Sequence, residues 1–185
     1  MENRIVIGMS YDPWHNLALE EILFEQQAEQ QGVTLYLWQN ENTVVIGKHQ
    51  NAWLECRMAL LEEEGGKLAR RSSGGGAVFH DLGNLNFTFL ARQSDYDLKR
   101  QMRVIGNAVG YFGIETEMTG RNDLVVKKSG AKFSGNAFRL SNAVGMQHGT
   151  LLVQTDMDKL GRYLSPAKEN TMAKGVKIVE TRVCN

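Results

Sequence analysis

Three consecutive glycines, Gly74 to Gly76, follow two arginines and two serines. Glycine leaves the backbone amides unshielded by a side chain, so an anion or a ligand backbone can approach the chain closely. The guanidinium groups of Arg70 and Arg71 add rigid sets of donors that suit a carboxylate or a phosphate. The segment therefore predicts an anion-binding loop, with a flexible loop as the alternative.

Lys132 lies in a second segment with glycines and serines, from Ser129 to Gly135. A lysine on such a tight segment can place its point charge against a phosphate, and a solvated lysine in a hairpin is the alternative. Ser129 and Lys132 also have the S-x-x-K spacing of serine acylases. That interpretation is disfavoured, because the K-T-G motif and a helix behind the serine are missing.

The histidines and cysteines do not form a recognisable motif. His80 and His148 are far apart in the sequence and lack clustered acids, so each is expected to be a hydrogen-bonding residue of a pocket or the core. Cys56 has apolar neighbours and is interpreted as a small core residue rather than a nucleophile. There is no P-loop motif, and the glycine run lacks the helix that follows it in dinucleotide-binding folds.

The composition is that of a globular protein. The chain has 185 residues, of which 42% are hydrophobic and 23% charged, so we expect one domain with a sizeable core. The apolar runs are too short to span a bilayer, and no signal peptide is recognisable. Two cysteines are too few for a disulfide framework or a four-cysteine zinc site, so a cytoplasmic location is expected.

The formal net charge of zero conceals an asymmetry. Residues 1–64 contain eleven acidic and three basic residues, whereas residues 65–185 contain ten acidic and eighteen basic ones. A basic excess of this kind favours an anionic ligand on the later part of the chain. An ordinary scatter of surface charges is the alternative.

Interleaved helices and strands must position these residues. Asp12 before Pro13 is a good helix start, and Trp14, Ala18 and Ile22 recur at helical spacing on its expected apolar face. The expected helices cover residues 13–30, 52–64, 96–112 and 157–165, with Asn51, Asp95 and Asp156 as the caps of the last three. The expected strands cover residues 4–8, 33–38, 43–46, 68–71, 77–80, 84–90, 123–126, 132–140 and 150–154.

The order of these elements indicates the fold class. Strand pairs around residues 33–46, 68–90 and 123–154 look like hairpins. We therefore expect an α+β fold with a mixed, mostly antiparallel sheet flanked by helices, rather than a doubly wound parallel sheet.

Six segments, spread in order over nearly the whole chain, resemble the motifs of the bacterial lipoate-protein ligases. They are Tyr11–Trp14, Thr43–Gly47, Arg70–Asn84, Gly120–Leu124, Lys132–Ala137 and His148–Leu152. The resemblance implies the biotin/lipoate protein ligase catalytic fold, with residues 1–185 as a single catalytic domain.

The resemblance also implies an activity in two half-reactions. (R)-lipoate and ATP, with Mg²⁺, give lipoyl-AMP and pyrophosphate. The lipoyl group then passes to a lysine of an acceptor, either a lipoyl domain of an oxo-acid dehydrogenase complex or the H protein of the glycine cleavage system. Neither a nucleic acid nor a membrane is expected as a partner.

The implied site centres on Lys132, whose charge would offset the repulsion between the carboxylate of lipoate and the α-phosphate. Asp123 could also hold Mg²⁺, and an apolar slot is needed for the dithiolane. The implied ATP or adenylate positions are Arg71, Gly76, Ala77, Val78, Phe79, Asn122, Asp123 and Lys132. The implied lipoate positions are Leu17, Val44, Arg71, Ser73, His80, Lys132, Gly135, Ala137 and His148.

The chain departs from the family near residues 182–185, beyond which these ligases usually continue. The resemblance therefore implies a large domain without its C-terminal end and small accessory domain, unless a separate polypeptide supplies them. Two alternatives stay open: a cysteine-dependent octanoyl or lipoyl transferase with Cys184 as the candidate nucleophile, and a non-catalytic module that binds lipoate or lipoyl-adenylate.

Overall fold

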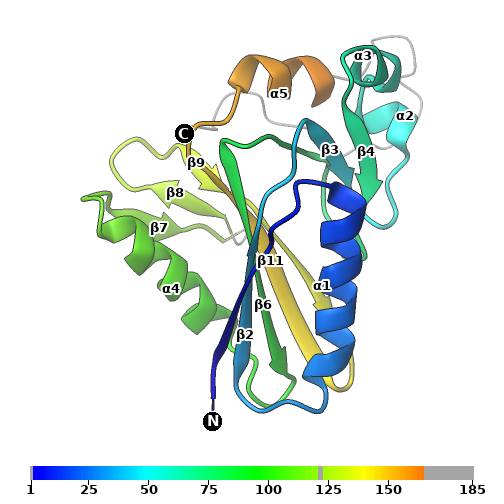
Figure 1. The fold of residues 1–185 in the computed structure, drawn as a ribbon. Coiled ribbons are helices and arrows are strands. Elements are labelled where there is room, and N and C mark those ends of the chain that lie inside the picture. Colours follow the sequence, from blue (N-terminus) through cyan, green and yellow to red (C-terminus); the bar gives the residue numbers. More distant parts are fainter. Residues whose placement is uncertain (1, 121–122, 165–185) are drawn as a thin grey trace.

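The computed structural model describes residues 2–120 and 123–164, and a five-stranded sheet runs through its middle (Figure 1). In order across the sheet, its strands are β1 (Arg4–Ile7), β2 (Val33–Trp38), β6 (Asn84–Arg92), β11 (Val144–Leu152) and β10 (Asn136–Leu140). β1 and β2 are parallel, and the other neighbours are antiparallel.

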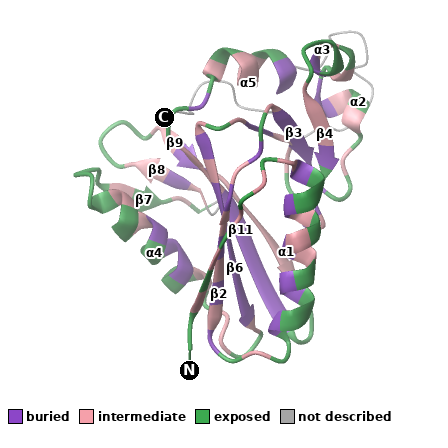
Figure 2. Ribbon diagram, viewed as in Figure 1, coloured by how far each residue is buried: buried purple, intermediate pink, exposed green. Residues whose placement is uncertain are grey.

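One helix packs on each face of this sheet. Helix α1 (Pro13–Gln27) covers one face, where Leu23 and Phe24 pack on Tyr36 and Trp38. Helix α4 (Leu98–Gly110) covers the other face, over the Phe87 side of β6. Buried residues are concentrated along β6 and β11 (Figure 2), so the centre of the sheet is the most closely packed part of the molecule's large sheet.

Two smaller sheets flank the upper part of the large one. The first has the order β4 (Lys67–Arg70), β3 (Thr43–Ile46), β5 (Val78–His80). Short helices α2 (Ala52–Glu55) and α3 (Met58–Glu63), together with α5 (Met157–Leu164), complete its core. The second has the order β7 (Thr116–Met118), β8 (Leu124–Val126), β9 (Lys132–Ser134).

The predicted fold class is confirmed, but two of the three predicted hairpins are wrong. Only β1–β2 and β3–β4 are parallel among the described strand pairs, so the arrangement is mixed and mostly antiparallel. The strands predicted to pair around residues 33–46 and 68–90 instead lie in different sheets or on opposite sides of β3. Within residues 123–154 the pairs β8–β9 and β10–β11 are antiparallel, as expected.

Helix α1 begins as predicted but buries a different face. The Asp12 carboxylate accepts from the amides of the next turn, and Pro13 opens the helix. Trp14 and Ile22 are 56% and 50% exposed and Ala18 is exposed as well, so the prediction is wrong for these three residues, whereas Phe24 and Leu17, also expected on the apolar side, pack in the core. The buried polar residues of the helix are Asn16, Glu20 and Gln27, and each is stabilised by a hydrogen bond to a neighbouring buried group.

The helix expected over residues 52–64 is broken at Cys56, whose backbone is extended. The break places the amide of Arg57 2.9 Å from the carbonyl oxygen of Tyr163, which ties the segment to α5. Cys56 is buried in the core, in agreement with its interpretation as a core residue, and burial raises the pKa of its thiol to about 11.

The remaining differences are local. Asp97, not Asp95, caps α4, which begins at Leu98, and Asp95 lies in the preceding turn, where its carboxylate is paired with Arg92 at 3.2 Å. Asp156 caps α5 as expected. Strand β7 was not predicted, and β11 begins at Val144. Within the described residues, no helix has the length and apolar composition needed to cross a membrane.

Candidate active site

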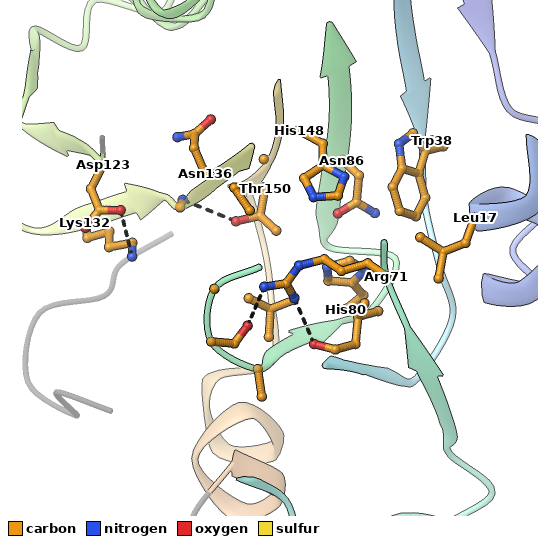
Figure 3. A pocket seen from close by; sticks show the side chains of 18 residues that line it. Leu17, Trp38, Arg71, His80, Asn86, Asp123, Lys132, Asn136, His148 and Thr150 are labelled. Atoms are coloured by element: carbon orange, nitrogen blue, oxygen red, sulfur yellow. Dashed lines mark hydrogen bonds and ion pairs between the residues drawn. The ribbon is translucent and has the colours of Figure 1, made fainter. Parts of the chain in front are cut away.

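A cavity of about 180 Å³ is lined by residues from α1 and from all three sheets (Figure 3). It brings together eleven of the residues predicted from the sequence. These are Leu17, Arg71, Gly76, Ala77, Val78, His80, Asp123, Lys132, Gly135, Ala137 and His148. Gly75, from the predicted anion-binding loop, also lines the cavity, and the lining residues that were not predicted are Trp38, Val45, Asn86, Asn136, Gly149 and Thr150.

Three of the described predicted residues do not line this cavity. Val44 and Phe79, which are neighbours in the β3–β5 register, lie in the core under α5. The next residue pair in that register, Val45 and Val78, lines the cavity instead, because successive residues of a strand face opposite sides. Val44 is therefore not a wall of the cavity. Ser73 contacts a lining residue, as described below, and Asn122 lies outside the described residues, as does Cys184.

The glycine loop is held in a tight conformation against β3. Gly75 has a positive φ of 91°, which favours glycine. A Cβ atom on Gly47 would lie 2.3 Å from the carbonyl oxygen of Gly75, so both positions need glycine for the loop to approach the strand.

Arg71 holds this loop together rather than presenting a free guanidinium to the cavity. Its Nη2 donates to the carbonyl oxygens of Gly74 and Gly76, both at 2.7 Å, and its Nε donates to the Ser73 hydroxyl at 3.1 Å. Burial lowers the pKa of Arg71 to about 10, against the opposing effect of Glu20, so the side chain keeps its charge at neutral pH. Arg71 thus contributes positive potential, and most of its donors are used within the protein.

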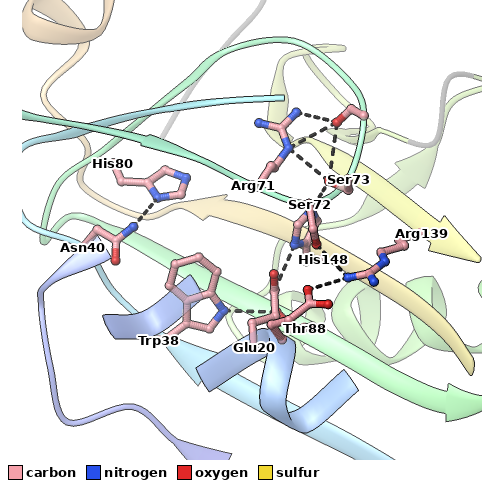
Figure 4. A network of polar contacts seen from close by, with 12 residues as sticks. Glu20, Trp38, Asn40, Arg71, Ser72, Ser73, His80, Thr88, Arg139 and His148 are labelled. Carbon is pink, nitrogen blue, oxygen red and sulfur yellow. Dashed lines mark hydrogen bonds and ion pairs between the residues drawn. The ribbon is translucent and has the colours of Figure 1, made fainter. Parts of the chain in front are cut away.

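A chain of buried polar contacts borders the cavity through Arg71 and His148 (Figure 4). His148 lies between Glu20 and Ser73: its Nδ1 is 2.8 Å from the Glu20 carboxylate, and its Nε2 is 2.6 Å from the Ser73 hydroxyl. Burial alone would raise the pKa of Glu20, but His148, Thr88 and Arg71 more than offset it, and the pKa stays below its ordinary value. Because a carboxylate only accepts, the Nδ1 atom of His148 carries a proton.

The order Ser73–His148–Glu20 has the connectivity of a catalytic triad. Ser73 is only 2% exposed and does not line the cavity, and its hydroxyl also accepts from Arg71. A substrate carbonyl therefore cannot reach this oxygen in the present geometry. We assign Ser73 and Glu20 to orienting His148. Through its contact with Arg71, Ser73 also helps to hold the glycine loop.

Lys132 and Asp123 form an ion pair at the cavity, with 3.0 Å between Nζ and Oδ1. A Cβ atom on Gly135 would lie 3.1 Å from this Nζ, so the glycine makes room for the lysine. The ammonium is thus held at the cavity by a partner that a bound anion could replace.

The described residues offer little to a resident metal. No group of three or more His, Cys, Asp or Glu side chains is arranged among them to hold an ion. Asp123 is the carboxylate among the described lining residues. The site therefore fits a Mg²⁺ ion only if phosphates and water supply most of its ligands, which is the usual way in which this ion binds at nucleotide sites.

Residues 12–185 match the family described as the lipoyl protein ligase A/B catalytic domain. The match covers most of the chain, so the protein belongs to this family, as the sequence motifs indicated.

Solved structures of related proteins have the same fold. P. falciparum LipL1, solved in complex with lipoate, has 34% sequence identity and a TM-score of 0.81, over 88% of this chain and 52% of its own. A lipoate-protein ligase A bound with ATP has 26% identity and a TM-score of 0.82, over 100% of this chain and 76% of its own. The bipartite lipoate protein ligase of Thermoplasma acidophilum, from a study that includes its E2 lipoyl domain, has 29% identity and a TM-score of 0.79, over 91% and 68%. The chain thus spans about half the length of LipL1.

Proposed function

We propose that this protein is an ATP-dependent lipoate-protein ligase that forms lipoyl-AMP and transfers the lipoyl group to a lysine of an acceptor domain. The observation that carries the proposal is the position of Lys132, whose ammonium lies at a cavity with apolar walls in a member of this family. Related proteins solved with lipoate and with ATP support it.

In the first half-reaction, a carboxylate oxygen of lipoate attacks the α-phosphorus of ATP. A new O–P bond forms, the bond to the β-phosphate breaks, and pyrophosphate leaves. Two anions must approach each other, and fixed positive charge offsets their repulsion. Lys132 would exchange its contact with Asp123 for contacts with the carboxylate and the phosphate, and buried Arg71 would add to the potential.

The nucleotide would lie along the glycine loop, where Gly76, Ala77 and Val78 line the cavity. Asp123 would supply one carboxylate to Mg²⁺, and the phosphates would supply further oxygen ligands. The bound ion would reduce the charge of the triphosphate.

In the second half-reaction, the amine of the acceptor lysine attacks the acyl carbon of lipoyl-AMP. An amide bond forms, AMP leaves, and the amine loses its proton. We propose lipoyl domains of oxo-acid dehydrogenase complexes as acceptors, supported by the E2 lipoyl domain studied with the Thermoplasma ligase. The H protein is a second acceptor to test.

Lipoate-dependent exchange of labelled pyrophosphate into ATP tests the adenylation step. We expect exchange by the wild-type protein and loss of at least a hundredfold in Lys132→Ala, on the scale of removing one electrostatic stabiliser of a transition state, roughly 10²–10³-fold. Lys128→Ala is the matched control, because Lys128 is exposed in the turn before β9.

Two results would contradict the proposal. The first is the absence of exchange, with or without an added accessory polypeptide. The second is near-normal exchange in Lys132→Ala. Saturable lipoate binding without exchange or transfer would instead support a non-catalytic binding module. Mass spectrometry of an E2 lipoyl domain incubated with the protein, lipoate and ATP tests the transfer step.

A further inference from the structure

The two ends of the cavity differ in chemistry. Lys132 and Asp123 lie at one end, and Leu17, Trp38 and Asn86 lie on the opposite side (Figure 3). We name the second region the Trp38 end and define it by Leu17, Trp38, His80 and Asn86. The ring of His80 belongs to it, because its centroid is 6.0 Å from that of Trp38.

His80 brings an unused polar atom to this apolar end. The side chain is 3% exposed, and its Nε2 has no hydrogen-bond partner among the described residues. Its Nδ1 is 3.1 Å from Asn40, which does not line the cavity. His80 is itself one of the residues that line the cavity. A buried unpaired polar atom costs about 1–3 kcal/mol, so its presence needs a reason.

A relay of two asparagines determines which nitrogen of His80 carries the proton. The Nδ2 of Asn16 is 2.9 Å from the carbonyl oxygen of Ser10 and 2.8 Å from that of Gln39. Backbone carbonyls only accept, so this atom of Asn16 is identified as the nitrogen despite the usual ambiguity of amide groups. The Oδ1 of Asn16 accepts from the Tyr36 hydroxyl at 3.1 Å, which agrees with this orientation.

The orientation of Asn16 fixes that of Asn40. The Nδ2 of Asn16 is 2.9 Å from the Oδ1 of Asn40, and a flipped Asn40 would place two donor groups at that distance. The Nδ2 of Asn40 must therefore face His80 and donate to its Nδ1. The Nδ1 atom is then the acceptor of the neutral ring, and the proton is on Nε2.

The charge state of His80 agrees with this assignment. Burial, together with the charges of Arg71 and His148, lowers the pKa of His80 to about 3. The ring is thus neutral at physiological pH, and its Nε2–H group is a donor without a partner among the described residues.

Asn86 presents a second such group at the same end. It lies opposite Trp38 in the β2–β6 register and is 1% exposed. Its Oδ1 accepts from the Nδ2 of Asn84 at 2.9 Å, whereas its own Nδ2 has no partner among the described residues. The Nε2–H donor of His80 and an unpaired buried atom of the Asn86 amide thus lie beside the indole of Trp38.

We propose that His80 Nε2–H, assisted by the Asn86 amide, donates to the sulfur-bearing end of the acyl substrate, and that the Asn16–Asn40 relay is the positioning device that keeps His80 a donor. The inference rests on the proposed function: a carboxylate held at Lys132 places the far end of its chain at the Trp38 end. Sulfur is a weak acceptor, but a hydrocarbon tail offers no acceptor and leaves the His80 donor unpaired. A site built to donate a hydrogen bond discriminates against an analogue that lacks the acceptor.

Calorimetric titration with three carboxylic acids tests the selectivity. The probes are lipoate, 5-cyclopentylpentanoic acid, which has the same ring size without sulfur, and octanoate. We expect the wild-type protein to bind lipoate roughly tenfold more tightly than the carbocyclic acid, the equivalent of one modest hydrogen bond. In His80→Phe this ratio falls toward one, whereas His49→Phe, the same change at an exposed position, keeps it.

The outcomes separate this inference from the proposed function. Equal binding of lipoate and the carbocyclic acid by the wild-type protein would overturn the selectivity while leaving the ligase proposal intact. An equal loss of affinity for all three acids in His80→Phe would place the donors at the carboxylate and would also overturn it. Binding of none of the three would instead count against the proposed function.

The relay has a test that needs neither substrate nor activity. In ¹H–¹⁵N correlation spectra of histidine-labelled protein, the His80 signals, assigned by their loss in His80→Phe, should show a neutral ring protonated at Nε2. Protonation at Nδ1 in the wild-type protein would overturn the relay. Asn40→Asp should move the proton to Nδ1, because a carboxylate only accepts, and should lower the lipoate preference while the ring remains.

Discussion

The ammonium of Lys132 lies 3.0 Å from the carboxylate of Asp123, and both side chains line the same cavity. A substrate carboxylate that binds Lys132 must therefore compete with a carboxylate of the protein. This competition makes lipoate affinity in the absence of nucleotide sensitive to Asp123.

Asp123→Asn should tighten the binding of lipoate in the absence of ATP. The pair is partly exposed, and such pairs contribute about 0.2–1 kcal/mol, so a gain of up to about fivefold is expected. Glu115→Gln is the control, because it removes the ion pair with exposed Lys127, which does not line the cavity. Calorimetry measures both variants, and weaker binding by Asp123→Asn would show that Asp123 does not compete for the ammonium.

Glu20→Gln should destabilise the protein by about 1–3 kcal/mol, because it removes the charged acceptor of buried hydrogen bonds from His148 and Thr88. Glu25→Gln, on the exposed side of the same helix, is the control and should change the free energy of unfolding by less than about 0.5 kcal/mol. Urea unfolding measures both values, and similar values for the two variants would contradict a stabilising role of the pair.

The same pair predicts a pH dependence. The pKa of Glu20 is held below its ordinary value of 4.5. The stability that this shift contributes is therefore present above about pH 4.5 and is lost as the pH falls through the folded-state pKa. The difference in unfolding free energy between wild type and Glu20→Gln should narrow in that acid range, and a difference that widens would have the wrong sign.

His80 predicts a second loss of stability in acid. Its pKa falls from an ordinary 6.5 to about 3 in the folded protein, so the unfolded chain takes up a proton at a pH where the folded protein does not. Stability is lost as the pH falls from about 6.5 to about 3. In His80→Gln this part of the pH dependence should disappear, whereas His49→Gln, at an exposed position, should keep it. Urea unfolding at several pH values gives the slopes, and equal slopes for the two variants would contradict the shift.

Gly47→Ala should disrupt the glycine loop. The added Cβ would lie 2.3 Å from the carbonyl oxygen of Gly75 and 3.3 Å from the Nη2 of Arg71, so the loop must move. We expect a loss of about 1–3 kcal/mol in unfolding free energy, together with weaker lipoate binding. Gly74→Ala is the control, since a Cβ there meets no atom within 4 Å. Equal stability of the two variants would show that the close approach is not required.

Signals within short segments predicted where most helices and strands lie. Which face of each element is buried, and which strand it pairs with, depends on contacts between residues far apart in the sequence. The caps Asp12, Asn51 and Asp156 act on amides of the next turn, so each could be identified from its neighbours. The buried face of α1 could not, because the partner that makes burial of Glu20 tolerable, Thr88, comes from β6. Hydrophobic spacing alone assigned Trp14 to the core instead.

In the candidate site, too, short motifs could be recognised from the sequence, whereas contacts that depend on strand register could not. Motifs indicated Lys132 and the glycine loop, because their chemistry lies in short segments. Val44 was predicted as a wall where Val45 lines the cavity, since a shift of one residue along a strand reverses the face. Asn86 has no motif, and it meets Trp38 only through the register of β2 and β6. The available signal for Asn86 was a polar residue at a strand position that is expected to be buried.

The contact between Glu20 and His148 joins residues 128 positions apart. At about 5–20 residues per second, a ribosome needs roughly 6–26 s to synthesise the intervening chain. During that interval the helix that contains Glu20 exists without the imidazole that completes its buried face. Docking of this helix is therefore expected to finish only after β11 has emerged. Until then, the N-terminal part of the chain is incompletely packed and exposed to chaperones and proteases.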